Sequence, residues 1–283
     1  MHPHGYIGRK MQLPQLKAQP AVVIAAFGST TRARSALDIF EARLKEVCPD
    51  HEIFWAYTSE IIRKKTGLPS LQQTLAQVEA QGFRRAVVQP LHVFPGTEYC
   101  QMAETCAYFP GLRVFMGETL FHRWEFITQT LEVLSSGFLP PEQGLNLLAL
   151  HGTPLAADPV NVVYLGLEKL VRDRYPNVLA AAIEGIPDHE AVFARIRQQG
   201  LADRFRQARI IPMMYFAGMH AREDLMGSED SWRTVLENMG FKVDCPMVLH
   251  GQKPLFKGLA HYPEVIGFLM ERLERVLSLA ACY

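Results

Sequence analysis

The stretch that decides the fold is Leu147-Leu148-Ala149-Leu150-His151-Gly152-Thr153-Pro154, in which four apolar residues lead into a histidine, a glycine and a turn. A short apolar run bounded by turn residues is typical of a strand buried on both faces, as in a parallel sheet. In open sheets of this kind, ligands bind beyond the C-terminal ends of the strands. We therefore expect His151 to lie at a ligand-binding edge of a parallel sheet.

Two later apolar runs end in a similar way. Residues 178–183 lead into Glu184 and Gly185, and residues 209–216 lead through a short turn to His220. A single histidine after a strand is more often a hydrogen-bonded turn residue than a ligand, because histidine is commonly half-buried. Three such residues at equivalent strand ends favour a site, and imidazole with carboxylate suits a divalent transition metal.

The composition is that of an ordinary folded enzyme. The 283 residues are 48% hydrophobic and 20% charged, and the formal net charge is zero. These values argue against disorder, and the lack of a basic excess argues against a nucleic-acid partner. The five cysteines form no Cys-x-x-Cys pair, so neither a zinc ribbon nor a disulfide scaffold is predicted. No apolar run is long enough to span a bilayer, and we expect no membrane partner.

The first residues lack the apolar centre of a secretory signal. We expect residues 1–20 to form a poorly ordered extension and the protein to be cytoplasmic. A processed periplasmic form remains the alternative.

The rest of the chain alternates between strand-like and helix-like segments. This alternation predicts an α/β fold of two similar doubly wound parallel-sheet lobes around a central cleft. The segment Pro140-Pro141-Glu142-Gln143-Gly144 is the best linker, dividing an N-terminal lobe of residues 21–140 from a C-terminal lobe of residues 141–283. Strands are predicted at 21–27, 52–57, 85–91, 112–115, 147–151, 178–184, 209–215 and 242–245, and helices at 31–47, 71–81, 124–134, 160–174, 189–198, 231–239 and 263–279.

The two halves align with each other as an imperfect repeat. Residues 26–29 match 150–153, and residues 90–96 match 212–218, which sets Glu98 against His220. We expect a duplicated fold in which the second half carries most of the metal-site residues.

At these residues the chain resembles the anaerobic sirohydrochlorin cobaltochelatases. The resemblance extends over about residues 21–279 and rests on three segments: Leu150–Pro154, Gln89–Tyr99, and Met213–Gly227 with its continuation to Trp232. It implies a class II chelatase fold with two α/β lobes around a tetrapyrrole cleft. It also implies ATP-independent insertion of Co²⁺ into sirohydrochlorin or precorrin-2, in anaerobic cobalamin biosynthesis.

The same resemblance implies roles for individual residues. His151 and His220 match the paired active-site histidines, and Glu98 and Glu184 match acidic positions near the metal. We therefore expect His151, Glu184 and His220 to hold the metal, and His151, His220 and Glu98 to be catalytic. Some members carry a leader and bind haem at a subunit interface. No leader is visible here, so no organic cofactor is predicted and a homo-oligomer remains open.

The chemistry fits these residue types. Two pyrrole N–H protons must leave, and a neutral imidazole accepts a proton near neutral pH because its unperturbed pKa is about 6.5. Histidine and carboxylate ligands can hold Co²⁺ while leaving positions open for the incoming nitrogens. The proton acceptor is one of the histidines or Glu98, and the sequence does not divide these roles.

Further residues are expected near the substrate. Phe27, Tyr99, Met214 and Tyr215 would line an apolar slot, although core packing is the favoured alternative for Met214. Three roles are open for His92: contact with substrate, support of the loop before Gly96, or haem ligation, of which we favour the structural one. The predicted substrate-binding set is Phe27, Gly28, Ser29, His92, Tyr99, Met214 and Tyr215, with Arg32, Arg34 and Arg222 as possible cationic partners for carboxylates or as solvated surface charges.

Other functions compete with cobalt insertion. A sirohydrochlorin ferrochelatase would use the same ligand types, which do not separate Co²⁺ from Fe²⁺ or Ni²⁺. A non-catalytic tetrapyrrole or metal carrier needs the ligands but no proton acceptor. A two-lobed solute-binding protein is disfavoured because no leader is visible.

Overall fold

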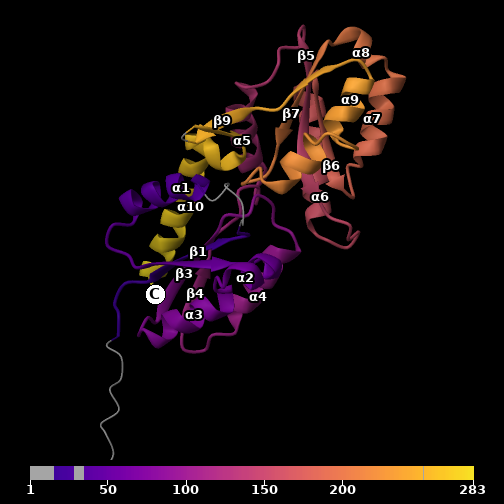
Figure 1. The fold of residues 1–283 in the computed structure, drawn as a ribbon. Coiled ribbons are helices and arrows are strands. Elements are labelled where there is room, and N and C mark those ends of the chain that lie inside the picture. Colours follow the sequence, from indigo (N-terminus) through magenta and orange to yellow (C-terminus); the bar gives the residue numbers. More distant parts are fainter. Residues whose placement is uncertain (1–15, 29–34, 251) are drawn as a thin grey trace, which may run out of the picture.

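The structure is a computed structural model that describes residues 16–28, 35–250 and 252–283. Its framework is a pair of four-stranded parallel sheets (Figure 1). The first contains β1 (Ala21–Ala26), β2 (Ile53–Tyr57), β3 (Arg85–Pro90) and β4 (Arg113–Met116), and the second contains β5 (Gly144–Gly152), β6 (Val178–Glu184), β7 (Gln207–Pro212) and β8 (Lys242–Asp244).

The two sheets have the same topology. The strand order is β2-β1-β3-β4 in the first and β6-β5-β7-β8 in the second. Each lobe thus begins with an inner strand, adds its next strand on one side, and then crosses over to the other side. The α/β class and the two similar doubly wound lobes predicted from the sequence are confirmed.

Helices cover the faces of both sheets. Those of the first half are α1 (Ser35–Val47), α2 (Glu60–Thr66), α3 (Leu71–Ala80), α4 (Thr97–Ala107) and α5 (Trp124–Ser135). The second half contributes α6 (Val160–Arg174), α7 (His189–Gln198), α8 (Leu201–Arg204), the π-helical turn η2 (Ala221–Leu225), α9 (Trp232–Asn238), the hairpin β9 (Met247–His250) and β10 (Lys253–Phe256), the 3₁₀ turn η3 (Leu259–His261) and α10 (Pro263–Ala281).

Three hydrophobic clusters hold these layers together. One lies on the outer face of the first sheet under α3 and α4, and a second lies on the outer face of the second sheet under α7 and α9. The third and largest contains residues of both sheets together with α1, α5, α6 and α10. All six residues of β1 are buried, as a strand covered on both faces requires. The shared cluster joins the two lobes through a common core.

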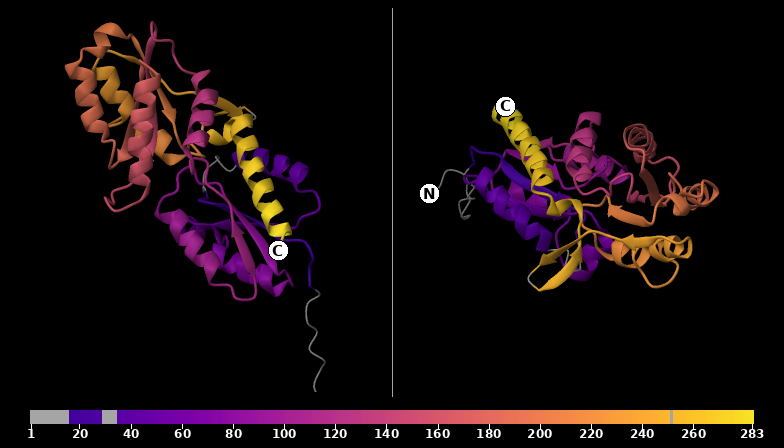
Figure 2. Two further views of the ribbon diagram at one scale, coloured as in Figure 1. Left: turned by 180° about the vertical axis from the view of Figure 1, so that it is seen from behind. Right: turned by 90° about the horizontal axis from the view of Figure 1, so that it is seen from above.

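The C-terminal helix does not stay with the second half of the chain. Figure 2 shows α10 running from the second lobe along the first, and it packs against α1, β3 and β4. Arg85 of β3 donates a hydrogen bond from Nη1 to the Ala280 carbonyl at 2.8 Å. The sequence assigned residues 263–279 to the C-terminal lobe. The helix instead packs on the first sheet. The amphipathic pattern of a helix shows that one face is buried but does not show which sheet it covers.

Several other elements differ from the sequence predictions. Helices α2 and α4 were not predicted, and α4 begins one residue before Glu98. Strand β7 ends at Pro212, so Met214 and Tyr215 lie in the following loop, where their carbonyls accept hydrogen bonds from Leu259 and Ala260. His220 therefore lies beyond a loop and not directly at a strand end.

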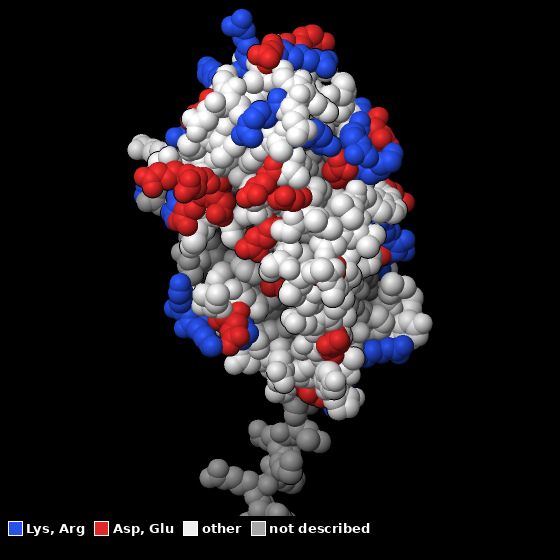
Figure 3. Space-filling model, turned by 90° about the vertical axis from the view of Figure 1, so that its right-hand side faces the viewer, with Lys and Arg blue, Asp and Glu red and all other residues white. Residues whose placement is uncertain are grey.

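Within the described ranges, no helix is both long enough and apolar enough to cross a membrane. Figure 3 shows one face of the molecule on which both signs of charge occur, with acidic side chains gathered across its middle.

Candidate functional site

The topology of each sheet marks one place where a ligand would bind. Strand connections leave β1 and β5 in opposite directions, so crevices open at the C-terminal ends between β1 and β3 and between β5 and β7. His151 is the second-last residue of β5, and its side chain is exposed. His92 follows the end of β3 by two residues. Each crevice therefore has a histidine at its edge.

The structure brings His151 and His220 together. Their Nε2 atoms lie 3.1 Å apart, and the rings are nearly perpendicular, with centroids 4.6 Å apart and an interplanar angle of 82°. The other nitrogen of His151, Nδ1, lies 3.1 Å from the carbonyl oxygen of Gly152. When Nδ1–H donates to that carbonyl, the Nε2 atom of His151 is left as an acceptor facing His220.

Asp224 supports the second histidine of the pair. Its Oδ2 lies 2.7 Å from His220 Nδ1, and both side chains are a little under half exposed. His220 immediately precedes η2 and Asp224 lies within it, and the wider turn of η2 contains the hydrogen bond from Met226 N–H to the Ala221 carbonyl. Single π-helical turns are rare and are often found at functional sites. By accepting from Nδ1–H, the carboxylate fixes the tautomer of His220 and directs Nε2 toward His151.

The separation of the two nitrogens suits two kinds of chemistry. They can share one proton in a hydrogen bond, or both can bind one metal ion. Imidazole bonds to an ion such as Zn²⁺ are about 2.0–2.1 Å, so two ligands at 90–109° would be about 2.8–3.4 Å apart. The observed 3.1 Å lies within that range. The two Nε2 atoms can therefore hold either one shared proton or one metal ion, with little movement of the side chains.

Glu184 comes close to the pair through its backbone. Gly152 pairs in register with Glu184, and Thr153 N–H donates to the Glu184 carbonyl at 3.0 Å. Gly152 has φ +81°, and a Cβ there would lie 1.8 Å from the Glu184 oxygen. The side chain of Glu184 is exposed. Within the described residues no group of three or more His, Cys, Asp or Glu side chains is arranged to hold a metal. The structure thus assembles the histidine pair but not the predicted triad, which stays a prediction.

Glu98 lies in a cluster of its own on the first lobe. His92 Nε2 is 2.9 Å from Glu98 Oε2 and 3.2 Å from the Thr58 hydroxyl, and the His92 side chain is only 10% exposed. His92 thus connects the end of β2 to the first turn of α4. The structural role favoured from the sequence stays a prediction. No hydrogen bond between described residues joins Glu98 to the histidine pair.

Asp158 ties the two regions together. Its Oδ1 accepts hydrogen bonds from the backbone N–H groups of Thr97 and Val160, both at 3.1 Å. One carboxylate therefore holds the starts of α4, which carries Glu98, and of α6. Phe94 packs edge-on against Tyr164 of α6 with centroids 4.7 Å apart. The Glu98 region is in this way fixed against the lobe that carries the histidines.

The remaining predicted residues fall into different places. Phe27 is 47% exposed at the end of β1, as an apolar slot would need. Tyr99 donates a hydrogen bond to the Gly117 carbonyl, and burial raises the pKa of its hydroxyl. Met214 and Tyr215 are only 8% and 5% exposed, so both belong to the core. For Met214 this was the favoured alternative.

Other predicted positions are less informative. Gly28 is buried with φ +96°, against Tyr57 and Ile62. Arg222 forms an ion pair with its neighbour Glu223. Ser29, Arg32 and Arg34 lie outside the described residues.

Four residues of these clusters have no role predicted from the sequence: Asp224, Asp158, Thr58 and Arg63. For Asp224 a signal existed, since His220 and Asp224 are four residues apart, the spacing of neighbours on a helical turn.

Comparison with known proteins identifies a family. The model of the cobalt chelatase family, CbiK, matches residues 20–278. The sirohydrochlorin cobaltochelatase CbiKC of Nitratidesulfovibrio vulgaris is 24% identical, over 95% of this chain and 94% of its own. The sirohydrochlorin cobaltochelatase of Salmonella typhimurium is 23% identical, over 92% of this chain and 97% of its own.

Solved structures share the fold. SirB from Bacillus subtilis, determined with Fe³⁺, superposes with a TM-score of 0.61 at 14% identity, covering 92% of this chain and 96% of SirB. DR2241 from Deinococcus radiodurans, a multi-domain protein with structural similarity to chelatases, gives a TM-score of 0.53 at 14% identity, over 91% of this chain and 55% of its own. At such identities the likeness concerns the fold alone.

Proposed function

The chain belongs to the cobalt chelatase family and is a metal chelatase, and we propose that it inserts Co²⁺ into sirohydrochlorin or precorrin-2 without ATP. The reaction exchanges two pyrrole N–H protons for one divalent ion. The protein must therefore hold the ion, present it to four nitrogens and accept two protons. On this proposal the enzyme acts in the oxygen-independent synthesis of cobalamin.

The observation that carries the proposal is the 3.1 Å separation of the two Nε2 atoms. It suits two adjacent ligands on one ion. In the proposed reaction, His151 and His220 hold Co²⁺ and Glu184 completes the set from the end of β6. A mixed histidine and carboxylate set binds such an ion without thiolate, and exchangeable positions remain for the tetrapyrrole nitrogens.

The protons have two acceptors within the proposed site. As the ion passes to the macrocycle, the Nε2 atoms of the histidine pair become free to take a proton, and Asp224 stabilises the charge that then develops on His220. Glu98 is the second acceptor, and its contact with His92 gives the proton a neighbouring imidazole. Both arrangements release two protons for each ion inserted.

The choice of Co²⁺ over Fe²⁺ rests on the family and on the two curated relatives. The ligand types themselves bind either ion. A competition in which both ions are present at equal concentration under anaerobic conditions tests the choice. Faster formation of the cobalt product supports the proposal, whereas faster iron insertion makes the protein a sirohydrochlorin ferrochelatase.

The activity itself is tested by an anaerobic absorbance time course, with sirohydrochlorin and Co²⁺ in large excess over the enzyme. We expect many turnovers per molecule, at a rate well above that of the uncatalysed reaction. A spectral change that stops at one equivalent would instead identify a carrier without turnover. A parallel reaction without protein gives the background rate.

A further inference from the structure

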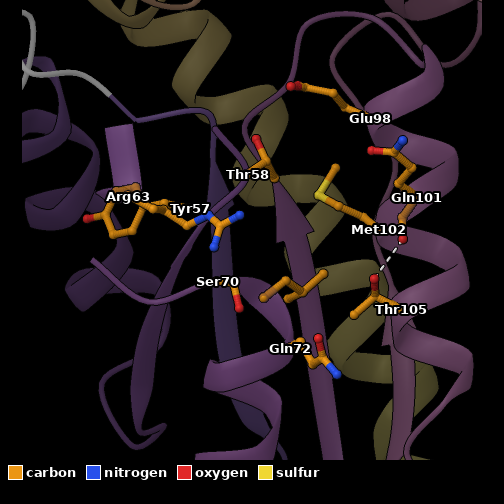
Figure 4. Close-up of a pocket in the computed structure, with 10 residues that line it drawn as sticks. Tyr57, Thr58, Arg63, Ser70, Gln72, Glu98, Gln101, Met102 and Thr105 are labelled. Carbon is orange, nitrogen blue, oxygen red and sulfur yellow. Dashed lines mark hydrogen bonds between the residues drawn. The ribbon is translucent and has the colours of Figure 1, made fainter. Parts of the chain in front are cut away.

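A polar pocket opens in the first lobe beside Glu98. It encloses about 250 Å³ between the end of β2, α2, the start of α3 and α4. Figure 4 shows Glu98 at one end of it, Gln72 and Ser70 toward the other, and the guanidinium of Arg63 reaching in between. We call it the Arg63 pocket. Eight of its ten lining residues have polar side chains, the exceptions being Leu71 and Met102.

Arg63 is the only cation among the described residues that line the pocket, and none of those residues forms a hydrogen bond or ion pair with its side chain. Its Nε atom is buried without a hydrogen bond, and no ion pair joins its guanidinium to any described residue. The acid on the same helix, Glu60, forms its ion pair with Lys64 at 2.7 Å, and Arg63 acts on it only as a more distant positive charge that helps to lower its pKa. A buried donor without a partner costs stability, so the Arg63 side chain would gain from an anionic partner that the described residues do not supply.

The neutral groups around Arg63 include further donors. The Thr105 hydroxyl donates to the Gln101 carbonyl and the Thr58 hydroxyl contacts His92 Nε2. The Ser70 hydroxyl accepts from Gln73 N–H, which leaves its own O–H as a donor. The side-chain amides of Gln72 and Gln101 form no hydrogen bond with any described residue, and both line the pocket. One planar guanidinium with two amides matches a single carboxylate, which arginine can bind through two parallel hydrogen bonds. A phosphate dianion would call for more positive charge.

The pocket also adjoins the proposed reaction site. Thr58 and Glu98 line it, and both contact the same atom, His92 Nε2, at the C-terminal edge of the first sheet. Glu98 is the only acid among the described residues that line the pocket, and its Oε2 lies 2.9 Å from His92 Nε2. The two apolar lining residues, Leu71 and Met102, suit the methylene stem of an acetate or propionate side arm.

From these observations we propose that the Arg63 pocket binds one carboxylate side arm of the tetrapyrrole. The arm leaves the macrocycle beside Glu98 and ends on the Arg63 guanidinium, which fixes the rotation of the ring over the metal-holding histidines. This inference rests on the proposed function, because it takes its ligand from the proposed substrate. Arg63 is accordingly a substrate-binding residue that takes no part in the proton transfers.

The test is a metal-free titration of the full-length protein with sirohydrochlorin, followed by absorbance. We compare the wild type with Arg63→Gln, Arg63→Lys and the matched control Lys65→Gln, which removes an exposed charge from the same turn of α2. Helix α2 contains no buried residue, so these substitutions leave the core intact. Loss of a charge-assisted contact should weaken binding about tenfold or more in Arg63→Gln. Arg63→Lys should lie in between, and Lys65→Gln close to the wild type.

Two further readouts separate a contact from a general effect. The slope of log Kd against log salt concentration should be smaller in Arg63→Gln than in Lys65→Gln, since one ionic contact is gone. In turnover, KM for the tetrapyrrole should rise while KM for Co²⁺ stays unchanged. An Arg63→Gln protein that binds sirohydrochlorin as tightly as the Lys65→Gln control overturns the pocket assignment alone. A wild type that does not bind sirohydrochlorin overturns the proposed function, and the pocket assignment with it.

Discussion

His151 and His220 are 69 residues apart in the chain, yet their Nε2 atoms lie 3.1 Å from each other. The first histidine is held by the end of β5, and the second begins the π-helical turn that follows the loop after β7. In the proposed function, the chemistry of the second lobe depends on this meeting of a histidine near a strand end with a histidine beyond a loop. The first lobe has the same strand order but carries Phe27 where the second carries His151.

Asp224 should act as a positioning residue for His220. Its replacement by asparagine leaves a weaker acceptor at Nδ1 and removes the fixed tautomer, which for such partners costs about 10–100-fold in metal affinity or activity. We expect kcat to fall by that amount in Asp224→Asn while KM for the tetrapyrrole is unchanged. The control is Glu223→Gln, an exposed neighbour. Equal kcat values for the two variants would rule out the positioning role.

Glu184 should matter more to the metal than to the tetrapyrrole. Glu184→Gln removes a charged ligand from the end of β6 but leaves the backbone contacts with Gly152 and Thr153 in place. We expect Kd for Co²⁺ to rise and Kd for metal-free sirohydrochlorin to stay constant, as measured by separate titrations. Glu190→Gln, which changes an exposed carboxylate in α7, serves as control. An unaltered Co²⁺ titration would remove Glu184 from the ligand set.

The chain after β5 and the chain after β6 approach each other closely near His151, and this approach depends on Gly152. A Cβ at this position would lie 1.8 Å from the Glu184 carbonyl oxygen. Gly67→Ala provides a matched comparison, because Gly67 has a similar positive φ, +71°, with no atom within 4 Å of its Cβ position. Backbone strain alone should cost Gly67→Ala about 1–2 kcal/mol, and the clash should add about 1–3 kcal/mol in Gly152→Ala. Urea unfolding measures both, and equal losses would mean that the loops can separate without cost.

Asp158 should stabilise the junction between the lobes. Asp158→Ala leaves the N–H groups of Thr97 and Val160 without their acceptor, which should lower the free energy of unfolding by about 1–3 kcal/mol. Because α4 carries Glu98, insertion activity should fall as well. The exposed Asp50 provides the control substitution Asp50→Ala. If both variants unfolded at the same urea concentration, the hydrogen bonds of Asp158 would not contribute to stability.

The local pattern of apolar residues was sufficient to predict most of the strands and helices. The apolar runs that became β1, β3, β5 and β6 are buried on both faces, and such strands stand out in a sequence because they lack alternation. Helix α4 was missed, because only Met102 and Cys106 are fully buried in it and its apolar face is narrow. The packing of α10 on the first sheet could not be predicted, since its amphipathic pattern is satisfied by either lobe.

The site was predictable to the extent that it lies at strand ends. His151 and Glu184 lie in the last two residues of their strands and His92 comes two residues after its strand, so the general rule for parallel sheets pointed to them. His220 was found as well, although the strand before it ends eight residues earlier. Asp158 and Arg63 were not found, because their importance comes from what they contact or fail to contact: two backbone N–H groups for Asp158, and no acceptor among the described residues for Arg63. Such relationships exist only in three dimensions.

The central claim is that the histidine pair carries metal insertion. The most direct test is the anaerobic insertion of Co²⁺ into sirohydrochlorin by the wild type, His151→Ala and the control His51→Ala. His51 lies in the turn before β2, at the opposite edge of the first sheet. We expect multiple turnovers by the wild type and the control, and loss of turnover in a folded His151→Ala protein. Near-normal turnover by His151→Ala would contradict the claim and leave the pair a structural feature.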